Sequence, residues 1–426
     1  MKRKTFIKQA VLGAVGISIL PRHVLGGPGY LAPSDRINLG YIGVGKQAPG
    51  LLRALNECPE SLVLAVCDVD TKKLDRFVRL ATEANTKKVA TAVTGYRDYR
   101  ELLERSDIDA VVVATPDHWH AQVTVDAAKQ GKDIYCEKPL ALTIAEGRAM
   151  VDAVRKHKRV LQTGSMQRSW QPFRHACELI INGYIGEVRE INVSVGGPVR
   201  QCDLPAHPVP DYLDWDQWVG PSLYRGYHPT LSPPIENDKE WAGWRHYRDF
   251  GGGYVTDWGA HMFDIVQWAL GMDDSGPVTF QAPGDPRATH GVSFRYANGV
   301  TVHHRLWGPD NAIQFIGSEG TIEVSRSFLR SNPESIVTQS LGPSAKRLYR
   351  SDNHYQDWLD AIKTRTRPVA DVEVGHRTAT VCNIVNIVYE LQRDLNWNPK
   401  KEVFDDPSAN LMRTRPYRAP WNFLDF

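Results

Sequence analysis

Between residues 37 and 163 the hydrophobic residues form short apolar runs that alternate with amphipathic stretches. Runs of this length predict buried strands, and they occur at residues 37–42, 62–67, 108–114, 133–136 and 159–163. The amphipathic stretches predict a helix after the first strand and further helices over residues 71–84 and 97–105. Thr143 and Glu146 form a capping box that begins another helix. This alternation of strands and helices predicts a parallel α/β sheet.

From about residue 164 the pattern changes to strands that are joined by hairpins. Residues 187–195 and 278–282 are predicted strands, and the Asn298-Gly299 pair is a strong hairpin signal between two apolar runs. A second hairpin joins residues 312–316 to residues 321–324. Several hairpins without intervening helices predict a separate α+β domain with a largely antiparallel, open sheet.

These patterns divide the 426 residues into three parts. We expect a signal peptide and lead-in over residues 1–34, a dinucleotide-binding Rossmann domain over residues 35–163, and an α+β domain over residues 164–426. The fold class is therefore α/β with two domains, which suits the length. Within the second part, residues 198–250 form a long predicted loop with eight Pro between 198 and 234. Loops of this length are usually functional or disordered.

The first residues have the features of an export signal. A basic start is followed by an apolar run over residues 10–20 and a small-residue exit near Gly26, which is the pattern of a signal peptide. The run is shorter than the about 20 residues that cross a bilayer. Arg3 and Lys4 resemble the pair of a twin-arginine signal, with Lys in place of the second Arg. We therefore expect an exported, periplasmic protein without a stable membrane anchor.

The charge balance excludes a nucleic-acid-binding protein. Five of the 51 Lys and Arg residues lie in the first 26 residues, which leaves 46 basic against 49 acidic residues in the mature chain. The mature chain therefore lacks the excess of positive charge that nucleic-acid-binding proteins use to contact phosphates. The six Cys residues are scattered with no CxxC pair, and Cys67 and Cys136 fall inside predicted strands, which favours a role as small core residues. One disulfide would still be compatible with an oxidising compartment.

The first predicted strand leads into a glycine turn of the kind that binds dinucleotides. Gly43, Gly45 and Ala48 occupy the GxGxxA positions between that strand and a helix. Asp68 closes the second strand about 20 residues later, where a carboxylate binds the adenine-side ribose hydroxyls. A 2′-phosphate would be repelled there, so the pattern favours NAD over NADP. A glycine turn without a ligand is the structural alternative.

Two more strands end in polar motifs. Pro116 and His120 belong to a segment that follows the strand at 108–114, and Glu137-Lys138-Pro139 follows the strand at 133–136. Ligands of open α/β sheets bind at such carboxyl ends. A fixed ammonium at Lys138 can polarise a substrate oxygen while hydride moves to the cofactor. His118 and His120 have no third ligand nearby, so we expect no metal site.

A glycine-rich segment at 251–253 begins a predicted helix that carries Asp257, His261 and Asp264. Their spacing places them on one helical face. A carboxylate one turn away can orient the imidazole and hold its tautomer, and the imidazole can then remove a proton from a hydroxyl group. The alternative is that this face meets solvent, or that His261 is a hydrogen-bonded core residue.

The long Pro-rich loop region contains four Trp residues: Trp215, Trp218, Trp241 and Trp244. The apolar face of a pyranose stacks on indole, so these residues could form a sugar-binding surface. Packing of the long loop explains the same residues equally well, and the sequence leaves both interpretations open.

The glycine turn, the Glu-Lys-Pro strand end and the Gly-Gly-x-x-x-Asp-x-Gly-x-His segment together resemble the glucose–fructose oxidoreductase/inositol dehydrogenase (Gfo/Idh/MocA) family, over residues 36–426. The resemblance implies that Lys138 contacts the reacting hydroxyl and the nicotinamide ribose. It implies that His261 is the general acid/base and that Asp257 supports it or binds a neighbouring hydroxyl. The second domain of the family commonly forms oligomer contacts, so a homo-oligomer, dimer or tetramer, is expected.

The resemblance also assigns the cofactor and substrate residues. The cofactor-binding set is Gly43, Gly45, Ala48, Asp68, Pro116, His120, Glu137 and Lys138. Candidates for the substrate pocket are Arg168, Trp244 and Tyr254. Because NAD is not freely available outside the cytoplasm, an exported enzyme must carry its cofactor, so we expect NAD to be tightly bound.

The sequence therefore predicts an exported NAD-dependent oxidoreductase that acts on a secondary hydroxyl of a sugar or glycoside. One alternative uses the same residues for glycoside cleavage, by transient oxidation and elimination, with the hydride returned at the end. The other alternative is a non-catalytic protein that binds a dinucleotide or a sugar.

Overall fold

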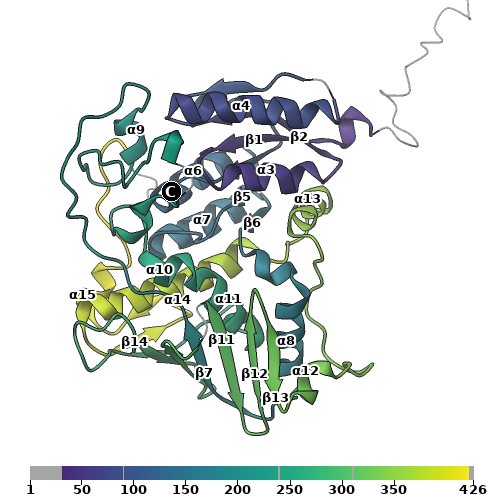
Figure 1. Ribbon diagram of the computed structural model, residues 1–426, viewed down its shortest axis with the longest axis vertical. Coiled ribbons are helices and arrows are strands. Elements are labelled where there is room, and N and C mark those ends of the chain that lie inside the picture. The colour runs from purple at the N-terminus through teal and green to yellow at the C-terminus, as the bar shows by residue number, and fades with distance from the viewer. Residues whose placement is uncertain (1–30, 90, 238–239, 309–310, 422–426) are drawn as a thin grey trace, which may run out of the picture.

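The computed structural model describes residues 31–89, 91–237, 240–308 and 311–421. The predicted export signal therefore lies outside the described residues, apart from the end of its lead-in. Two sheets organise the chain, and Figure 1 shows one in the upper half and one in the lower half of the molecule. Within the described ranges, no helix is long and apolar enough to cross a membrane.

The first sheet is parallel and has six strands, five of which the apolar runs predicted; the short strand over Thr94–Tyr96 is mostly exposed and was not predicted. Its order is β3-β2-β1-β4-β5-β6. The strands are β1 (Ile37–Ile42), β2 (Ser61–Cys67), β3 (Thr94–Tyr96), β4 (Ala110–Val113), β5 (Asp133–Cys136) and β6 (Leu161–Thr163). The strand order reverses between β1 and β4, and ligands of such sheets bind in the crevice at this switch point.

Helices cover both faces of the first sheet. They are α3 (Ala48–Asn56), α4 (Thr71–Thr86), α5 (Tyr99–Leu103), α6 (Asp117–Lys129) and α7 (Ile144–Lys156). Thr143 and Glu146 cap α7 reciprocally, so the predicted capping box is confirmed. The sequence pattern did not reveal α6, because this helix is buried around most of its circumference and has no polar face to produce an amphipathic pattern.

The second sheet is mixed and mostly antiparallel, which confirms the predicted α+β domain. Its order is β13-β12-β11-β7-β10-β9-β8-β14-β15, and β7 and β10 are parallel neighbours. The strands are β7 (Val188–Ser194), β8 (Thr279–Gln281), β9 (Ser293–Arg295), β10 (Thr301–His304), β11 (Ala312–Gly317), β12 (Thr321–Ser325), β13 (Leu329–Asn332), β14 (Leu395–Asn398) and β15 (Val403–Phe404). Both predicted hairpins are present, as β9–β10 and β11–β12.

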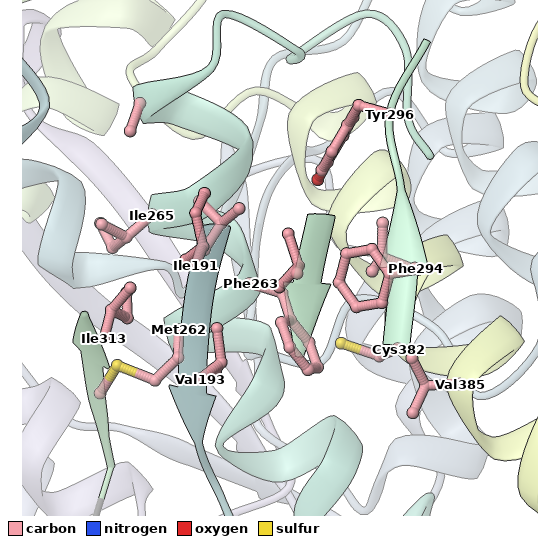
Figure 2. Packing of buried hydrophobic residues seen from close by; sticks show 14 of the residues in the cluster. Ile191, Val193, Met262, Phe263, Ile265, Phe294, Tyr296, Ile313, Cys382 and Val385 are labelled. Atoms are coloured by element: carbon pink, nitrogen blue, oxygen red, sulfur yellow. The ribbon is translucent and has the colours of Figure 1, made fainter. Parts of the chain in front are cut away.

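Helices pack on one face of the second sheet and form its core. The remaining helices are α8 (Gln171–Ile181), α9 (Trp215–Val219), α10 (Gly253–Asp257), α11 (Gly259–Ala269), α12 (Ser335–Thr338), α13 (His354–Thr364), α14 (Val372–Leu391) and α15 (Pro407–Leu411), with 3-10 turns η1 (Pro33–Asp35), η2 (Met166–Ser169), η3 (Ile235–Asn237) and η4 (Gly243–His246). Figure 2 shows Phe263 of α11 between Val193 of β7 and Phe294 of β9, and Met262 of the same helix between Val193 and Ile313 of β11. Burial of these side chains removes apolar surface from water and holds α11 in place.

The chain returns to the first domain after it has formed most of the second sheet. Trp358 on α13 is fully buried among apolar residues of the first sheet. Its ring centroid lies 5.6 Å from that of Tyr135 on β5, and α13 lies beside α3 in Figure 1. Residues well beyond 163 therefore complete the core of the dinucleotide-binding domain, a long-range contact that local sequence pattern does not reveal.

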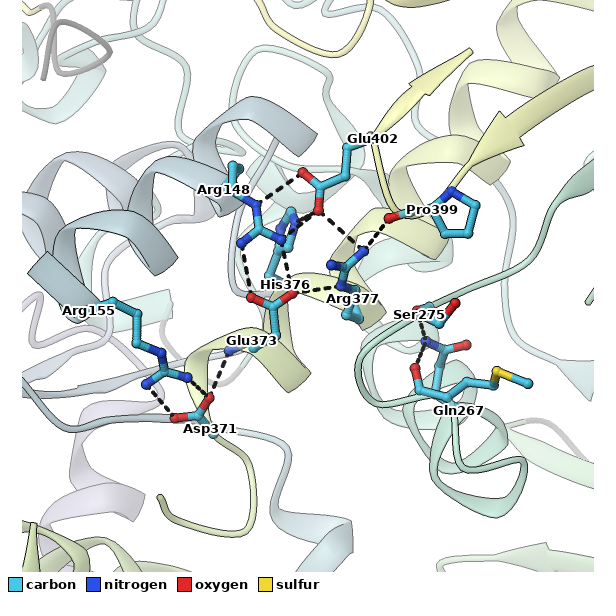
Figure 3. A network of polar contacts seen from close by, with 11 residues as sticks. Arg148, Arg155, Gln267, Ser275, Asp371, Glu373, His376, Arg377, Pro399 and Glu402 are labelled. Carbon is cyan, nitrogen blue, oxygen red and sulfur yellow. Dashed lines mark hydrogen bonds and ion pairs between the residues drawn. The ribbon is translucent and has the colours of Figure 1, made fainter. Parts of the chain in front are cut away.

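A polar network joins α7 of the first domain to α14 and the residues before β15. Arg148 binds Glu373 at 2.9 Å and Glu402 at 2.6 Å, and His376 Nε2 lies 2.8 Å from the same Glu402 carboxylate. Figure 3 shows these residues together. Because the charges are partly buried and satisfied by several partners, the network fixes how the two helices meet.

The Pro-rich segment 198–250 is an ordered loop structure with its own small apolar cluster. Trp215 and Trp218 of α9 stack with their ring centroids 4.5 Å apart and their planes at 13°, and both are buried. Trp218 O accepts a hydrogen bond from Trp119 Nε1 at 2.9 Å, which ties the segment to α6. The packing interpretation therefore accounts for these two Trp residues.

Candidate active site

A cavity of about 750 Å³ lies where the carboxyl ends of the first sheet meet α10, α11 and the 198–250 segment. It is lined by residues of both predicted domains, with Gly43, Gly45 and Lys138 on one side and Tyr254 and His261 on the other. Its size suits a dinucleotide together with a small polar molecule.

The glycine turn forms one end of this cavity. Gly43 has φ +81°, and a Cβ atom there would lie 2.6 Å from Thr115 N, so only glycine fits. A Cβ at Gly45 would meet nothing within 4 Å, which leaves open space beside the turn. Ala48 is fully buried at the start of α3. Backbone N–H groups at such a helix start bind phosphate groups, so the turn fits the pyrophosphate of a dinucleotide.

Asp68 lines the same end of the cavity and also supports the turn. Its carboxylate accepts hydrogen bonds from Val44 N at 2.8 Å and from Asp70 N at 2.9 Å. Burial raises the pKa of Asp68. The charge of Lys73 and these two hydrogen bonds act in the opposite direction and lower this pKa. Each carboxylate oxygen can accept a further bond, so Asp68 can bind a ribose hydroxyl and hold the glycine turn at once.

Pro116 and His120 lie beside the cofactor end, at the start of α6. Pro116 is the N-cap residue of α6, and both residues line the cavity. The His120 ring lies between two carbonyl groups, with Nδ1 2.9 Å from Pro139 O and Nε2 3.1 Å from Thr115 O. Burial lowers the pKa of His120 to about 4. The ring is therefore neutral at pH 7, so it donates its single N–H to one of the two carbonyl groups and packs between the β4 end and the Glu-Lys-Pro segment.

Glu137 is buried below the centre of the cavity. Its Oε1 accepts a hydrogen bond from Gln47 Nε2 at 2.9 Å, and its Oε2 accepts one from Lys138 N at 3.2 Å. Burial raises the pKa of Glu137. Glu137 thus links the glycine turn to the strand end that carries Lys138.

Lys138 and Asp257 join the two domains inside the cavity. Lys138 Nζ donates to Asp257 Oδ1 at 2.5 Å and to Asp257 O at 3.0 Å. Burial would raise the pKa of Asp257, but Lys138 and Arg245 together hold it below its usual range. The carboxylate is therefore ionised, and it fixes the ammonium at the side of the cavity.

His261 faces the cavity from α11. Its side chain is almost fully buried, and its Nδ1 has no hydrogen-bond partner within the described part of the chain. Burial, followed by the positive charges of Lys138 and Arg326, holds the pKa of His261 well below the usual value. The imidazole is therefore neutral and can accept a proton from a bound molecule.

The predicted single face of Asp257, His261 and Asp264 is confirmed only in part, because Asp257 and His261 both line the cavity and Asp264 does not. The helix is interrupted at Trp258, so Asp257 ends α10 while His261 and Asp264 belong to α11. Asp257 is bound to Lys138 instead of orienting the imidazole.

Arg168 also differs from expectation, because it does not line the cavity. Its guanidinium is 1% exposed and pairs with Asp264 at 2.8 Å and with Asp273 at 2.7 Å. Two carboxylates are needed to compensate a charge this deep in the protein. Arg168 is therefore a buried structural residue behind the site, and it uses the Asp264 side chain that was expected beside His261.

The aromatic candidates line the opening of the cavity. Tyr254 is 43% exposed, and Trp244 is buried beneath Arg245, whose guanidinium lies 4.3 Å from the indole centroid. Trp241 is 54% exposed and also lines the cavity. Trp241 is the only exposed one of the four Trp residues in this region, but Arg245 and Lys46 lie over its ring, 4.7 Å and 5.3 Å from the centroid.

Sequence reasoning missed several charged residues of the cavity, among them Arg245 and Arg326. Arg245 lies at the end of the 198–250 segment, and Arg326 lies in the turn between β12 and β13. Neither belongs to a recognisable motif, and only the folded chain brings them to the site. Within the described ranges, no group of three or more His, Cys, Asp or Glu could hold a metal ion.

Comparison with known proteins agrees with this geometry. Residues 37–165 match the family described as "Oxidoreductase family, NAD-binding Rossmann fold", and residues 196–423 match "Oxidoreductase family, C-terminal alpha/beta domain". A glycosyl hydrolase family 109 protein of Shewanella pealeana is 31% identical over 173 residues, which are 37% of this chain and 38% of that relative. The chain thus aligns with well under half of that curated relative.

Solved structures share the fold at low identity. An aldose-aldose oxidoreductase from Caulobacter crescentus, complexed with glycerol, has a TM-score of 0.59 at 18% identity and covers 85% of this chain and 99% of its own. A levoglucosan dehydrogenase in complex with NADH and levoglucosan has a TM-score of 0.56 at 20% identity, with the same coverages. At these identities the likeness shows that the two-domain architecture is shared.

Proposed function

The chain belongs to the Gfo/Idh/MocA oxidoreductase family, and from this premise we propose that it is an NAD-dependent oxidoreductase acting on a secondary hydroxyl of a sugar or glycoside. One observation carries the proposal. Lys138 of the first domain and His261 of the second line the same cavity, beside a glycine turn that fits a dinucleotide, and the Lys138 charge acts directly on the His261 ring.

The site residues divide the chemistry between them. Bound NAD would supply the acceptor for hydride. Lys138 can donate a hydrogen bond to the substrate hydroxyl and stabilise negative charge on its oxygen. His261 is neutral and lines the cavity, so its imidazole can take the hydroxyl proton. Asp257 holds the ammonium in position through two hydrogen bonds.

The fit of the cofactor rests on the turn and on the buried acids. Gly43 lets the turn approach the Thr115 backbone closely, and Gly45 leaves open space for a pyrophosphate. Asp68 can bind a ribose hydroxyl, and Glu137 ties the turn to Lys138. We propose that NAD remains bound through purification and that the protein is exported with its cofactor in place. Denaturing the purified protein and assaying the supernatant for NAD tests the first statement; a supernatant free of NAD contradicts it.

A sugar panel tests the activity itself. The NAD-loaded protein is mixed with sugars and glycosides, and nicotinamide absorbance near 340 nm and the products are followed. Reduction of the cofactor together with a keto-sugar supports the proposal. Ligand binding without turnover across the panel would instead favour a non-catalytic binding protein.

The second candidate is glycoside cleavage without net oxidation. The similarity to glycosyl hydrolase family 109 proteins favours it. Oxidation of a hydroxyl, with bound NAD as hydride acceptor, would acidify the neighbouring C–H, and elimination would then release the aglycone and leave an unsaturated ketone. Water would add to the double bond, and return of the hydride to the ketone carbon would restore the hydroxyl. A released reducing sugar with no accumulation of reduced cofactor identifies this reaction.

We also propose that the protein forms a homo-oligomer, dimer or tetramer, because the second domain of the family commonly provides such contacts. Light scattering on the purified protein measures the mass, and a monomer across the micromolar range contradicts the proposal.

A further inference from the structure

Arg326 brings an unpaired positive charge into the part of the cavity that belongs to the second domain. It lies in the turn between β12 and β13 and lines the cavity together with His261. Within the described part of the chain, no carboxylate forms an ion pair with it. Lys138, by contrast, is compensated by Asp257.

The guanidinium is held in a defined orientation. It lies over the ring of Trp258, 4.6 Å from the centroid, and 5.4 Å from that of Trp170. Its Nε donates to Gln167 Oε1 at 3.2 Å. Gln167 is itself fully buried. Two indole rings and one fixed acceptor therefore orient the group, and its two terminal amino groups have no hydrogen-bond partner among the described residues.

The position of Arg326 relative to the catalytic base is set by a shared neighbour. Trp258 contacts Arg326 through its ring face and lies 5.7 Å from the His261 ring, centroid to centroid. A sugar whose hydroxyl meets His261 can therefore place another substituent against Arg326. The glycine turn that would hold the cofactor phosphates belongs to the other domain, so Arg326 is available for the substrate.

The surrounding acids do not neutralise this charge. Asp257 is bound to Lys138, and Glu137 accepts its hydrogen bonds from Gln47 and Lys138. Burial lowers the pKa of Arg326, while Asp257 and Glu137 act on it only through space. Arg326 remains charged at any physiological pH. A partly desolvated cation with free donors is best compensated by an anionic ligand.

We propose that Arg326 binds a carboxylate on the substrate, so that the sugar is a uronic acid or a glycoside of one. The planar fork of two amino groups matches the two oxygens of a carboxylate. The inference rests on the proposed function and narrows its substrate class. It assigns to Arg326 a role in specificity, separate from the proton and hydride transfer at Lys138 and His261.

The experiment compares substrates that differ in one group. The NAD-loaded protein is assayed with methyl glycosides of glucuronic, galacturonic and mannuronic acid and with the matched neutral methyl glycosides. The 6-phosphates of the neutral glycosides form the third set. Each is tested on the wild type, Arg326→Gln, Arg326→Lys and the control Arg330→Gln. Arg330 lies on the same hairpin but is paired with Glu323 away from the cavity, so its variant loses the same charge without touching the site.

We expect the wild type to prefer a uronide to its neutral partner, and Arg326→Gln to reduce kcat/KM for the uronide on the order of 10- to 100-fold, as for loss of a charged hydrogen bond. The ratio of kcat/KM for the uronide to kcat/KM for the neutral glycoside should fall towards one in Arg326→Gln. It should fall only partly in Arg326→Lys, because Lys keeps the charge but lacks the two amino groups of the guanidinium. Arg330→Gln should keep the wild-type ratio.

The outcomes distinguish a failure of the carboxylate site from a failure of the proposed function. Equal use of neutral and acidic glycosides, or a ratio unchanged in Arg326→Gln, overturns the carboxylate site and leaves the oxidoreductase intact. Preference for the 6-phosphates overturns the carboxylate in favour of a phosphate ligand. Failure to bind or convert any sugar overturns the proposed function together with this inference.

Discussion

Lys138 Nζ lies 2.5 Å from Asp257 Oδ1, and this contact joins the strand end of one domain to the helix α10 of the other inside a shared cavity. The pair means that the proposed catalytic ammonium is held by the domain that also carries His261. The same ion pair therefore connects the two domains at the site and orients Lys138.

Replacing Lys138 by Ala should abolish turnover while the protein still folds. Loss of a preorganised donor to a developing negative charge typically costs about 10²–10³ in rate, and the cofactor should remain bound because the glycine turn is untouched. Sugar oxidation and circular dichroism are measured side by side. Undiminished activity in a folded variant would count decisively against the proposed site.

Replacing His261 by Asn should lower kcat by about 10²–10⁴, as expected for loss of a general base. The wild-type pH profile gives an independent check. Because burial and nearby positive charges depress the pKa of His261, the base stays neutral as pH falls through 6.5, and kcat/KM should keep its plateau below that pH. An acidic limb centred near 6.5 that disappears in the variant would show an ordinary, solvated imidazole instead.

Gly43→Ala and Gly45→Ala should have different effects. Gly43 has positive φ and no room for a Cβ, so its variant should be destabilised by about 1–3 kcal/mol and should also lose NAD. A Cβ at Gly45 meets nothing within 4 Å, so that variant should keep its Tm without cofactor and lose NAD affinity alone. Thermal unfolding with and without NAD distinguishes them. Equal Tm losses in both variants would contradict the described turn.

Replacing Arg168 by Met should destabilise the protein strongly. It leaves Asp264 buried without its main partner, and breaking a buried ion pair costs about 3–5 kcal/mol. The fraction that folds should keep its KM, because Arg168 lies outside the cavity. Urea unfolding and steady-state kinetics report the two quantities separately; a raised KM at unchanged stability would return Arg168 to the substrate pocket.

Stability should decrease as pH falls from about 6.5 towards 4. Burial depresses the pKa of His118 to about 3, and of His120, His304 and His354 to about 4. Each of these residues remains neutral in the folded protein but takes up a proton in the unfolded chain below about pH 6.5. Protonation therefore favours the unfolded chain, and the free energy of unfolding decreases as the pH falls below that value.

The slope identifies the groups responsible. Each such histidine removes about 1.4 kcal/mol per pH unit within this window, whereas carboxylates with depressed pKa values, such as Glu402, lose their contribution only at lower pH. Urea unfolding at pH 7, 6 and 5 measures the slope. A free energy of unfolding that is flat over this range would contradict the prediction.

Local pattern was enough to predict much of the fold. The ends of β1 and β5 agree with the apolar runs, and the glycine turn, the capping box and both hairpins lie where the residues indicated them. These features depend on residues close together in the chain, whose periodicity and turn chemistry are visible in the sequence.

The remaining features depend on contacts between distant residues. Asp264 shares a predicted face with Asp257 and His261 but pairs with Arg168 outside the cavity, and periodicity alone could not show it. Arg168 is a candidate pocket residue from the sequence alone, but in the structure Asp264 and Asp273 form ion pairs with it outside the cavity. Arg326 reaches the cavity from a hairpin turn that carries no motif, and no spacing rule would have selected it.

The packing of Trp358 against Tyr135 has a consequence for biosynthesis. The nucleotide-binding half lacks part of its apolar interior until α13 has left the ribosome, which happens after β13 has been made. Early release of residues 35–163 would expose the surface that α13 covers. Maturation of this half is therefore coupled to translation of nearly the whole polypeptide, and separate expression of the two halves should yield insoluble material.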